Sequence, residues 1–178
     1  RLKTDKSVIT DLPEKIELIE WVGLTDEQKT LYHKTIEKTL DAIATAPQGE
    51  RHGKILGLLT RLKQICNHPG LALKEGYVET NFSTRSAKVQ RLDEILEEVL
   101  EAGDRALLFT QFAEWGHSLK CYLEKKWKCD VPFLYGGTST TQRQAMIDRF
   151  QQDPRGPQIF LLSLKAGGVG LNLTRANH

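Results

Sequence analysis

Three short polar segments of this sequence carry groups suited to binding an anion, and each directly follows a short apolar run. Hydroxyls, cations and the backbone amides at helix starts are the groups that bind phosphate in proteins. If the apolar runs are parallel strands of an open sheet, their carboxyl ends meet at one edge, where ligands bind. An ordinary turn or cap explains any one segment alone, but three in succession favour a shared site. The segments contribute Thr110 and Gln111, then Gly136 and Gly137 with Arg143 one helical turn further on, and then Ser163 and Lys165.

The third segment, from Ser163 to Thr174, is rich in glycine. Glycine lets backbone N–H groups approach an anion closely, so this stretch fits an anion-binding turn. Glycines are also common in ordinary turns after strands. Gly168 and Gly170 lack the third glycine of a dinucleotide-binding fingerprint, and no helical pattern follows them. The stretch alone therefore indicates only a generic phosphate or anion contact.

Several other chemistries are disfavoured by the sequence. It contains no G-x-x-x-x-G-K-[ST] phosphate loop, and no Ser/His/acid set stands out. Asp93 and Glu94 imitate an acidic metal-binding pair, but we expect them on the solvated face of an amphipathic helix. Cys66 and His68 lack the second pair of a zinc site, and a packed cysteine at a helix end is the simpler interpretation. We therefore predict no catalytic residue and no metal ligand within this chain.

Elements that could position the three polar segments alternate from Ser86 onward. Ser86 is a candidate N-cap for a helix that ends at Gly103. Strands are predicted over 106–110, 131–135 and 158–162, with a helix over 115–127 and another opened by the capping box 139–142. This alternation predicts βαβ units and a parallel sheet.

The residues before Ser86 have a different, mainly helical pattern. Pro and Gly are expected to mark the ends of these helices, because Pro disfavours the α region for the residue before it. The predicted elements are an extended strand over 12–22, a helix opened by the capping box 25–28 and ended by Pro47 and Gly49, a second helix over 55–66 that stops at 67–70, and a polar loop or domain boundary over 74–84.

Composition is that of an ordinary soluble protein of one domain, or one domain with an appendage: 178 residues, 39% hydrophobic and 27% charged. A net charge of +2 neither demands nor excludes nucleic acid, so any basic surface must be local. Cys66, Cys121 and Cys129 form no C-x-x-C pair, which fits a reducing compartment. With neither a signal peptide nor a membrane-spanning stretch, we expect an intracellular, soluble protein without a membrane partner, in the cytoplasm or nucleoid of a bacterium or the nucleus of a eukaryote.

Taken in order, the motifs resemble the Swi/Snf-type ATPases of helicase superfamily two, in their second RecA-like motor lobe. The similarity covers nearly the whole chain, and its most specific part is Leu59–Pro69. The other matching segments are Leu12–Lys15 with Leu24–Tyr32, Ser86–Lys88, Leu108–Phe112 (motif four), Tyr135–Thr138 with Arg143 and Phe150, and Ser163–Thr174 (motif five).

The resemblance implies an α/β fold: a partial RecA-like parallel-sheet lobe of the three-layer P-loop NTPase type, with an N-terminal helical appendage. Residues 1–84 would form a lead-in strand and a helical protrusion that guides duplex DNA. Residues 85–178 would form the lobe, ending before motif six. With no polar tail after residues 171–177, we expect a piece of a longer protein.

The same resemblance implies an ATP-driven translocase on double-stranded DNA that remodels protein–DNA complexes. The partners would be the duplex, the first RecA-like lobe of the same protein and the complex being remodelled. ATP and Mg²⁺ would serve the full-length enzyme, with the metal ligands on the first lobe and none bound here, so the chain alone should not hydrolyse ATP. The alternative is a non-catalytic module that binds nucleic acid or protein. By analogy the DNA backbone would contact Thr110, Gln111, Gly136, Gly137, Arg143, Ser163 and Lys165, and the ATP cleft would contain Gly168, Gly170 and Asn172, with Asn172 near the ribose.

Overall fold

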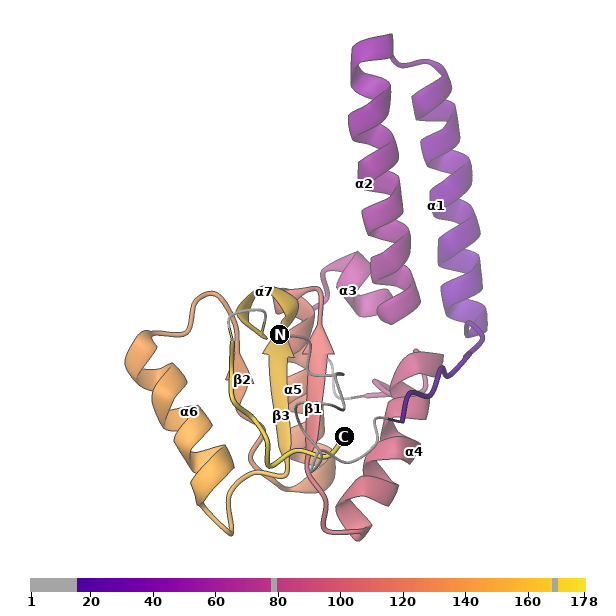
Figure 1. The fold of residues 1–178 in the computed structure, drawn as a ribbon. Coiled ribbons are helices and arrows are strands. Elements are labelled where there is room, and N and C mark those ends of the chain that lie inside the picture. Colours follow the sequence, from indigo (N-terminus) through magenta and orange to yellow (C-terminus); the bar gives the residue numbers. More distant parts are fainter. Residues whose placement is uncertain (1–15, 78–79, 168–169) are drawn as a thin grey trace.

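The chain folds into a small parallel sheet flanked by helices, from which two long helices project (Figure 1). This computed structural model describes residues 16–77, 80–167 and 170–178. The projecting pair is α1 (Asp26–Ala44) and α2 (Gln48–Asn67). The flanking helices are α4 (Ala87–Glu101), α5 (Ala113–Trp127) and α6 (Thr140–Gln152), with short helices α3 (Pro69–Leu73) and α7 (Leu164–Gly167).

The sheet has three parallel strands, as predicted, in the order β1 (Ala106–Thr110), β3 (Ile159–Ser163), β2 (Phe133–Leu134). Every residue of the central strand β3 is buried. Successive side chains of a strand point to opposite faces, so β3 contributes to two cores. Ile159 and Leu161 join the core that α4 and α5 cover, whereas Phe160 and Leu162 join the core beneath α6. Two helical layers around one sheet confirm the predicted three-layer α/β class.

Strand β2 is shorter than the predicted run 131–135, because backbone groups of Val131 and Tyr135 bond to side chains instead of a strand. The backbone N–H of Val131 donates to Glu124 at 3.3 Å, and its carbonyl accepts from Lys120 at 2.8 Å. At the other end, the N–H of Tyr135 donates to the Thr138 hydroxyl at 3.1 Å. Only Phe133 and Leu134 remain in the ladder.

Helix α1 begins where the sequence places it, whereas α2 begins at Gln48, seven residues before the predicted range 55–66. The capping box is formed: the Thr25 hydroxyl accepts from the Gln28 N–H, and the Gln28 side chain accepts from the Thr25 N–H. Helix α1 ends at Ala44, three residues before Pro47, so the predicted stop at Pro47 is confirmed but the role given to Gly49 is wrong. Pro47 is also the residue preceding α2, and Gly49 lies in the first turn of α2. The fixed φ of proline suits a helix start, so here it opens a helix as well as closing one.

His68 ends α2 and starts α3. Its backbone is extended, and its Nδ1 atom accepts from the Gly70 N–H at 3.0 Å. Its Nε2 atom therefore carries the proton and donates to the Phe82 carbonyl at 2.9 Å. The ring stacks between Phe82 and Trp115, with centroids 4.5 and 4.9 Å away. Burial lowers the pKa of His68, so the imidazole is neutral at neutral pH. Both ring nitrogens are used within the protein, as a structural helix end requires.

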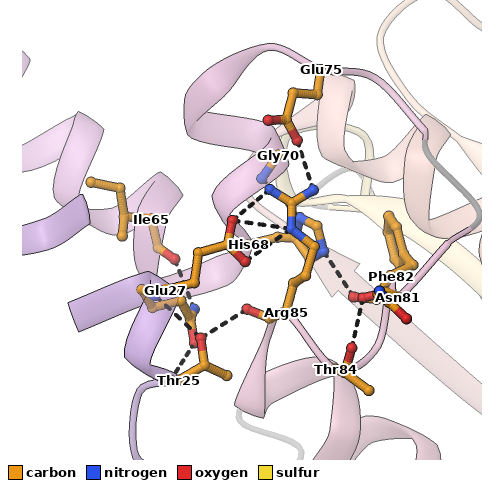
Figure 2. Close-up of polar contacts among 11 residues, drawn as sticks. Thr25, Glu27, Ile65, His68, Gly70, Glu75, Asn81, Phe82, Thr84 and Arg85 are labelled. Carbon is orange, nitrogen blue, oxygen red and sulfur yellow. Dashed lines mark hydrogen bonds and ion pairs between the residues drawn. The ribbon is translucent and has the colours of Figure 1, made fainter. Parts of the chain in front are cut away.

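A polar junction fixes the projecting helices to the sheet part (Figure 2). The Arg85 guanidinium donates to Glu27 at 2.6 Å and to Glu75 at 2.7 Å, and so joins α1 to the loop after α3. The Thr25 hydroxyl donates to the Arg85 carbonyl at 3.1 Å. Buried Gln28 donates to the Ile65 carbonyl of α2 at 2.8 Å. These bonds cross between α1, α2 and the start of α4, so the projection has a defined orientation.

The predicted strand over 12–22 is not present in its described part. Residues 12–15 lie outside the described residues, and residues 16–25 belong to no helix or strand. Among the described residues, no strand pairs with this segment. Ile16, Leu18 and Trp21 are 81, 81 and 90% exposed, so the apolar alternation covers no core here. Glu20 ties the segment to α4 through an ion pair with Arg91 at 2.9 Å.

Helix α4 confirms the Ser86 cap but corrects the assignment of Asp93. The Ser86 hydroxyl accepts from the Val89 N–H. Asp93 was expected to be solvated but is 7% exposed, because positions 89, 93 and 96 share the face turned toward α5. Its carboxylate accepts from the Ser83 hydroxyl at 2.7 Å and the Tyr122 hydroxyl at 2.6 Å, and it pairs with Lys126 at 2.7 Å. Of the two acidic residues, Glu94 lies on the exposed face as expected, and Asp93 does not.

Candidate functional site

The carboxyl ends of β1, β2 and β3 lie at one edge of the sheet, as the parallel pattern predicts (Figure 1). We call this the strand-end edge: residues 110–111, 135–138 and 163–167. Thr110 and Ser163 are register partners, one at the last position of β1 and one at the last position of β3. The glycine pair Gly136 and Gly137 follows β2 on the other side of β3. The structure thus brings the three sequence-predicted segments together.

The two hydroxyls at this edge close the turns that follow their strands. Thr110 Oγ1 accepts from the Phe112 N–H and donates to the Phe112 carbonyl, both at 3.2 Å. Ser163 Oγ accepts from the Ala166 N–H at 3.3 Å. Thr110 and Ser163 are 6% and 5% exposed. Both residues therefore shape the edge, and the groups that solvent reaches are those beside them.

The exposed residues of the strand-end edge are the apolar Leu164 together with Gln111, Gly136, Gly137 and Lys165. Lys165 has no hydrogen bond or ion pair among the described residues, so its ammonium group is available to an anion. A Cβ atom at Gly137 would lie 2.6 Å from the Tyr135 ring, so this position requires glycine. The edge thus combines accessible backbone with one unpaired cation.

Helix α7 was not predicted; the sequence indicated only a glycine-rich turn after Ser163. The chain instead makes a short helix, Leu164–Gly167, directly on the carboxyl end of β3. Arg143 of α6 donates to the Ala166 carbonyl at 3.2 Å. A Cβ atom at Gly167 would lie 2.8 Å from the Phe109 ring, which shows how closely α7 packs on β1. The sequence does contain one helix-start signal here. Ser163 has a hydroxyl that accepts from the N–H three residues later, as an N-cap serine does.

A groove of about 500 Å³ joins α6 to the segment after α7. It brings Arg143, predicted to contact DNA, together with Gly170 and Asn172, predicted to lie in the ATP cleft. Gly170 has a φ of +61°, a backbone conformation that favours glycine. Gly168 lies outside the described residues. The groove is lined by Arg143, Gln144, Ile147, Gly170, Leu171 and Asn172.

Asn172 also borders a second groove of about 290 Å³ on the same face of the sheet, lined mainly by apolar residues. Leu107, Phe109 and Leu162 form part of its lining, and Phe109 is 55% exposed. The polar carboxamide of exposed Asn172 therefore lies between two grooves, each of which has both polar and apolar surface. This arrangement suits a ligand with both a flat apolar part and hydroxyl groups.

Two arginines that sequence reasoning missed bind carbonyls at the end of α6, and one of them, Arg175, fixes the Asn172 segment there. Arg175 donates to the carbonyls of Gln151 and Asp153 at the end of α6, at 3.1 and 2.8 Å. Buried Arg105 donates to the Phe150 carbonyl at 2.6 Å and to three more carbonyls nearby. Burial lowers the pKa of Arg105, with the nearby Arg175 charge adding to the effect. Each arginine satisfies carbonyls that a helix end leaves free.

The last residues run beside the outer edge of β1. The N–H of Leu107 donates to the His178 carbonyl at 2.9 Å, and the His178 N–H donates to the Arg105 carbonyl at 3.2 Å. Asp104 accepts from Asn177 at 2.6 Å and pairs with His178 at 2.9 Å. The hydrogen bonds from Asn177 and His178 lower the pKa of Asp104. The Asn172 segment is therefore anchored on both α6 and β1.

An α/β lobe with polar groups converging at the carboxyl ends of its parallel strands is the architecture of a nucleotide-driven motor lobe, and the comparisons agree. The chain matches the helicase conserved C-terminal domain over residues 87–178 and the SNF2-related domain over residues 1–71. The chain belongs to the SWI2/SNF2 family of helicase superfamily two, with the features of its second motor lobe.

Relatives of known sequence are much longer than this chain. The Bacillus subtilis protein YwqA, whose name describes an ATP-dependent helicase or translocase, is 40% identical over 178 residues, which are 100% of this chain and 19% of that protein. The yeast ISWI chromatin-remodeling complex ATPase ISW1 is 33% identical over 99% of this chain and 16% of its own length. The chain thus spans less than a fifth of either relative.

Solved structures share the fold over nearly the whole chain. The Sulfolobus solfataricus SWI2/SNF2 ATPase core in complex with double-stranded DNA has a TM-score of 0.83 and 39% identity, covering 99% of this chain and 36% of that one. The C-terminal domain of the Sulfolobus ATPase has a TM-score of 0.76 and 40% identity, over 86% of this chain and 65% of that one. Within the described part of our chain, no helix combines the length and apolar character needed to cross a membrane.

Proposed function

We propose that this chain is the second lobe of an ATP-dependent translocase that moves along double-stranded DNA and remodels protein–DNA complexes. Residues 1–84 form the lead-in segment and the protrusion, and residues 85–178 form the lobe. The family and the likeness to an ATPase core bound to double-stranded DNA support this function. The observation that carries it is the in-register pairing of Thr110 with Ser163, which places the polar segments at one edge.

The DNA side is the strand-end edge. Lys165 is exposed and unpaired among the described residues, and phosphate contacts from such cations supply most of the sequence-independent affinity for DNA. Gln111 and the accessible backbone at Gly136 and Gly137 add neutral contacts to the same backbone. Thr110 and Ser163 hold the turns that present these groups. Because these groups recognise the sugar–phosphate backbone, they suit a protein that moves along any sequence.

The ATP side begins at Gly168, Gly170 and Asn172. The carboxamide of Asn172 can bind a ribose hydroxyl, and the groove beside it, lined mainly by apolar residues, suits an adenine ring. No group of three His, Cys, Asp or Glu side chains that could hold a metal occurs among the described residues. We therefore assign the Mg²⁺ ligands and the phosphate loop to the first lobe. When bound between the lobes, Mg²⁺–ATP supplies the phosphoryl group whose hydrolysis drives the cycle.

Arg143 connects the two sides. It bonds to the Ala166 carbonyl in α7, next to Lys165, and it lines the groove that contains Gly170 and Asn172. A shift of the Asn172 segment on ATP binding would therefore change the position of α7 and its lysine. The proposed coupling element is the segment 163–172 together with Arg143.

Measuring duplex DNA binding by the chain over a range of salt concentrations tests the DNA side. Each phosphate contact contributes about 0.9 to the slope of log affinity against log salt. We expect Lys165→Ala to reduce that slope by about one contact. Arg155→Ala is the matched control, because Arg155 is an exposed cation at the opposite edge, just before β3. Equal effects of both substitutions would contradict a localised DNA contact.

A second measurement, DNA-dependent ATP hydrolysis with the first lobe added, separates the alternative function. A non-catalytic module would bind DNA or protein but would not restore DNA-dependent ATP hydrolysis when it is combined with the first lobe. Restoration supports the motor lobe. Salt-sensitive DNA binding without restoration supports the module.

A further inference from the structure

A groove between α1 and α2 is lined by three basic side chains that the proposed function does not use. It has a volume of about 360 Å³ and lies in the middle of the projection. No carboxylate lines it. The lining residues are Lys38, Thr39 and Ala42 of α1 and Lys54, Gly57, Leu58 and Arg61 of α2.

The cations of this groove are weakly neutralised. Lys38 and Arg61 make no ion pair or side-chain hydrogen bond among the described residues. Lys54 faces Glu50 at 3.8 Å, and the Glu50 side chain is 63% exposed, so this pair is loose. Helix α2 contains four Lys or Arg residues and one Glu, whereas the whole chain has a net charge of +2. Two of these four cations, Lys54 and Arg61, line the groove.

The floor of the groove is open enough for a compact anion. Nothing lies within 4 Å of a Cβ atom built at Gly57, and Ala42 opposite it is also small. Thr39 offers a hydroxyl at the floor. Cations on both helices around a small-residue floor form a site for a phosphate group, which can take hydrogen bonds from several donors at once.

The position of the groove links it to the strand-end edge. The projection rises on the side of the sheet to which the strands point (Figure 1). At 1.5 Å of rise per residue, Arg61 and Lys54 lie about 9 and about 20 Å along α2 from its last residue, Asn67. The junction at Arg85 and His68 fixes the orientation of the projection. A duplex lying on the strand ends would thus run beside a wall that carries these cations.

We propose that the Lys38–Lys54–Arg61 groove binds the phosphate backbone of duplex DNA, as a second contact outside the motor's strand-end edge. This inference rests on the proposed function, because it assigns a second contact to the same DNA. The groove keeps the duplex aligned with the lobe while the strand-end contacts release and rebind. The recognition is of phosphate and carries no base sequence.

The test is the salt dependence of binding of the chain to a fluorescently labelled DNA duplex, measured by anisotropy. Arg61→Ala should reduce the slope of log affinity against log salt by about 0.9, and the triple Ala variant at Lys38, Lys54 and Arg61 by two to three times as much, at about 0.9 per contact. Lys63→Ala is the matched control. Lys63 is an exposed cation two residues further along α2, about 200° around the helix, and should leave the slope unchanged. Circular dichroism confirms that each variant keeps its helices.

The outcomes separate this proposal from the function on which it rests. If Lys165→Ala lowers the slope but Arg61→Ala does not, the groove proposal is overturned and the proposed function stands. If the unsubstituted chain binds no duplex, both fail. Equal effects of Arg61→Ala and Lys63→Ala indicate diffuse charge and overturn the groove. The groove is also overturned if its variants lose binding to a poly-glutamate peptide but keep the DNA slope, because the occupant is then an acidic protein segment.

Discussion

Thr110 and Ser163 are register partners at the last positions of two neighbouring parallel strands, and each hydroxyl closes the turn that follows it. This pairing fixes the spacing of the strand ends beside them. The exposed cation Lys165 and the amide Gln111 are therefore presented from a rigid edge rather than from two independent loops. The proposed coupling of DNA and ATP depends on this rigidity, because a flexible edge would not transmit a shift of the Asn172 segment.

The first prediction divides the coupling element into two functions. In the protein containing both motor lobes, Asn172→Ala should weaken ATP use about fivefold, the loss of about one hydrogen bond, with little change in DNA affinity. Lys165→Ala should weaken DNA binding by a similar or larger factor and spare nucleotide affinity. Nucleotide titrations and DNA anisotropy on the same preparations measure both. Equal losses of DNA affinity with unchanged nucleotide affinity would show that the division is wrong.

A second prediction concerns the buried carboxylate of Asp93. Asp93→Ala leaves Ser83, Tyr122 and Lys126 without their shared partner, so the free energy of unfolding should fall by about 3 kcal/mol. Glu94→Ala, one residue away on the exposed face, should change it by less than about 0.5 kcal/mol. Urea denaturation of the two variants measures both values. Similar values for both variants would show that Asp93 contributes no more to stability than an exposed carboxylate.

A third prediction follows from the lowered pKa of His68. The unfolded state has the higher pKa, near the ordinary value of about 6.5, so it binds a proton more readily than the folded state in mildly acidic solution. Stability should be complete above about pH 7 and decline as pH falls through 6.5, at up to about 1.4 kcal/mol per pH unit. The control is His68→Gln, which cannot take up this proton. The variant should be less stable at pH 7.5, but its stability should lack the decline that His68 causes below pH 7. Identical pH profiles for both proteins would refute the role given to His68.

A fourth prediction contrasts two glycines in helices. A Cβ atom at Gly116 of α5 would overlap the Phe133 ring, so Gly116→Ala should destabilise the fold by about 1–3 kcal/mol. Nothing lies within 4 Å of a Cβ atom at Gly53 of α2. Gly53→Ala should therefore stabilise the protein by about 0.5–1 kcal/mol, the usual helix preference of Ala over Gly. Thermal unfolding of the pair should give shifts of opposite sign.

Local signals in the sequence predicted local structure well. Thr25 with Gln28 and Ser139 with Gln142 form the two predicted capping boxes, because both partners lie within one turn of chain. The buried apolar runs that became β1 and β3 were also placed within a residue, and their alternation with helices was enough to predict a parallel sheet.

The errors occurred where a distant partner decides the outcome. The segment 16–22 has strand-like residues but pairs with no strand in the described part of the chain, and β2 is shortened by side chains of α5. Asp93 is buried because Tyr122 and Lys126 arrive from another helix. At the site, the convergence of the strand ends followed from topology. The roles of Arg105 and Arg175 did not follow from topology, because the carbonyls that they bind lie at the far end of α6.

The most direct test of the motor-lobe account is ATP hydrolysis by this chain with and without its proposed first lobe, each measured with and without duplex DNA. The account predicts no turnover by the chain alone under either condition, because the phosphate loop and the metal ligands are assigned to the other lobe. It predicts DNA-stimulated turnover when the two lobes are combined, and a decrease of that turnover by about fivefold with Asn172→Ala. DNA-stimulated hydrolysis by the chain alone, or no hydrolysis by the combined lobes, would contradict it.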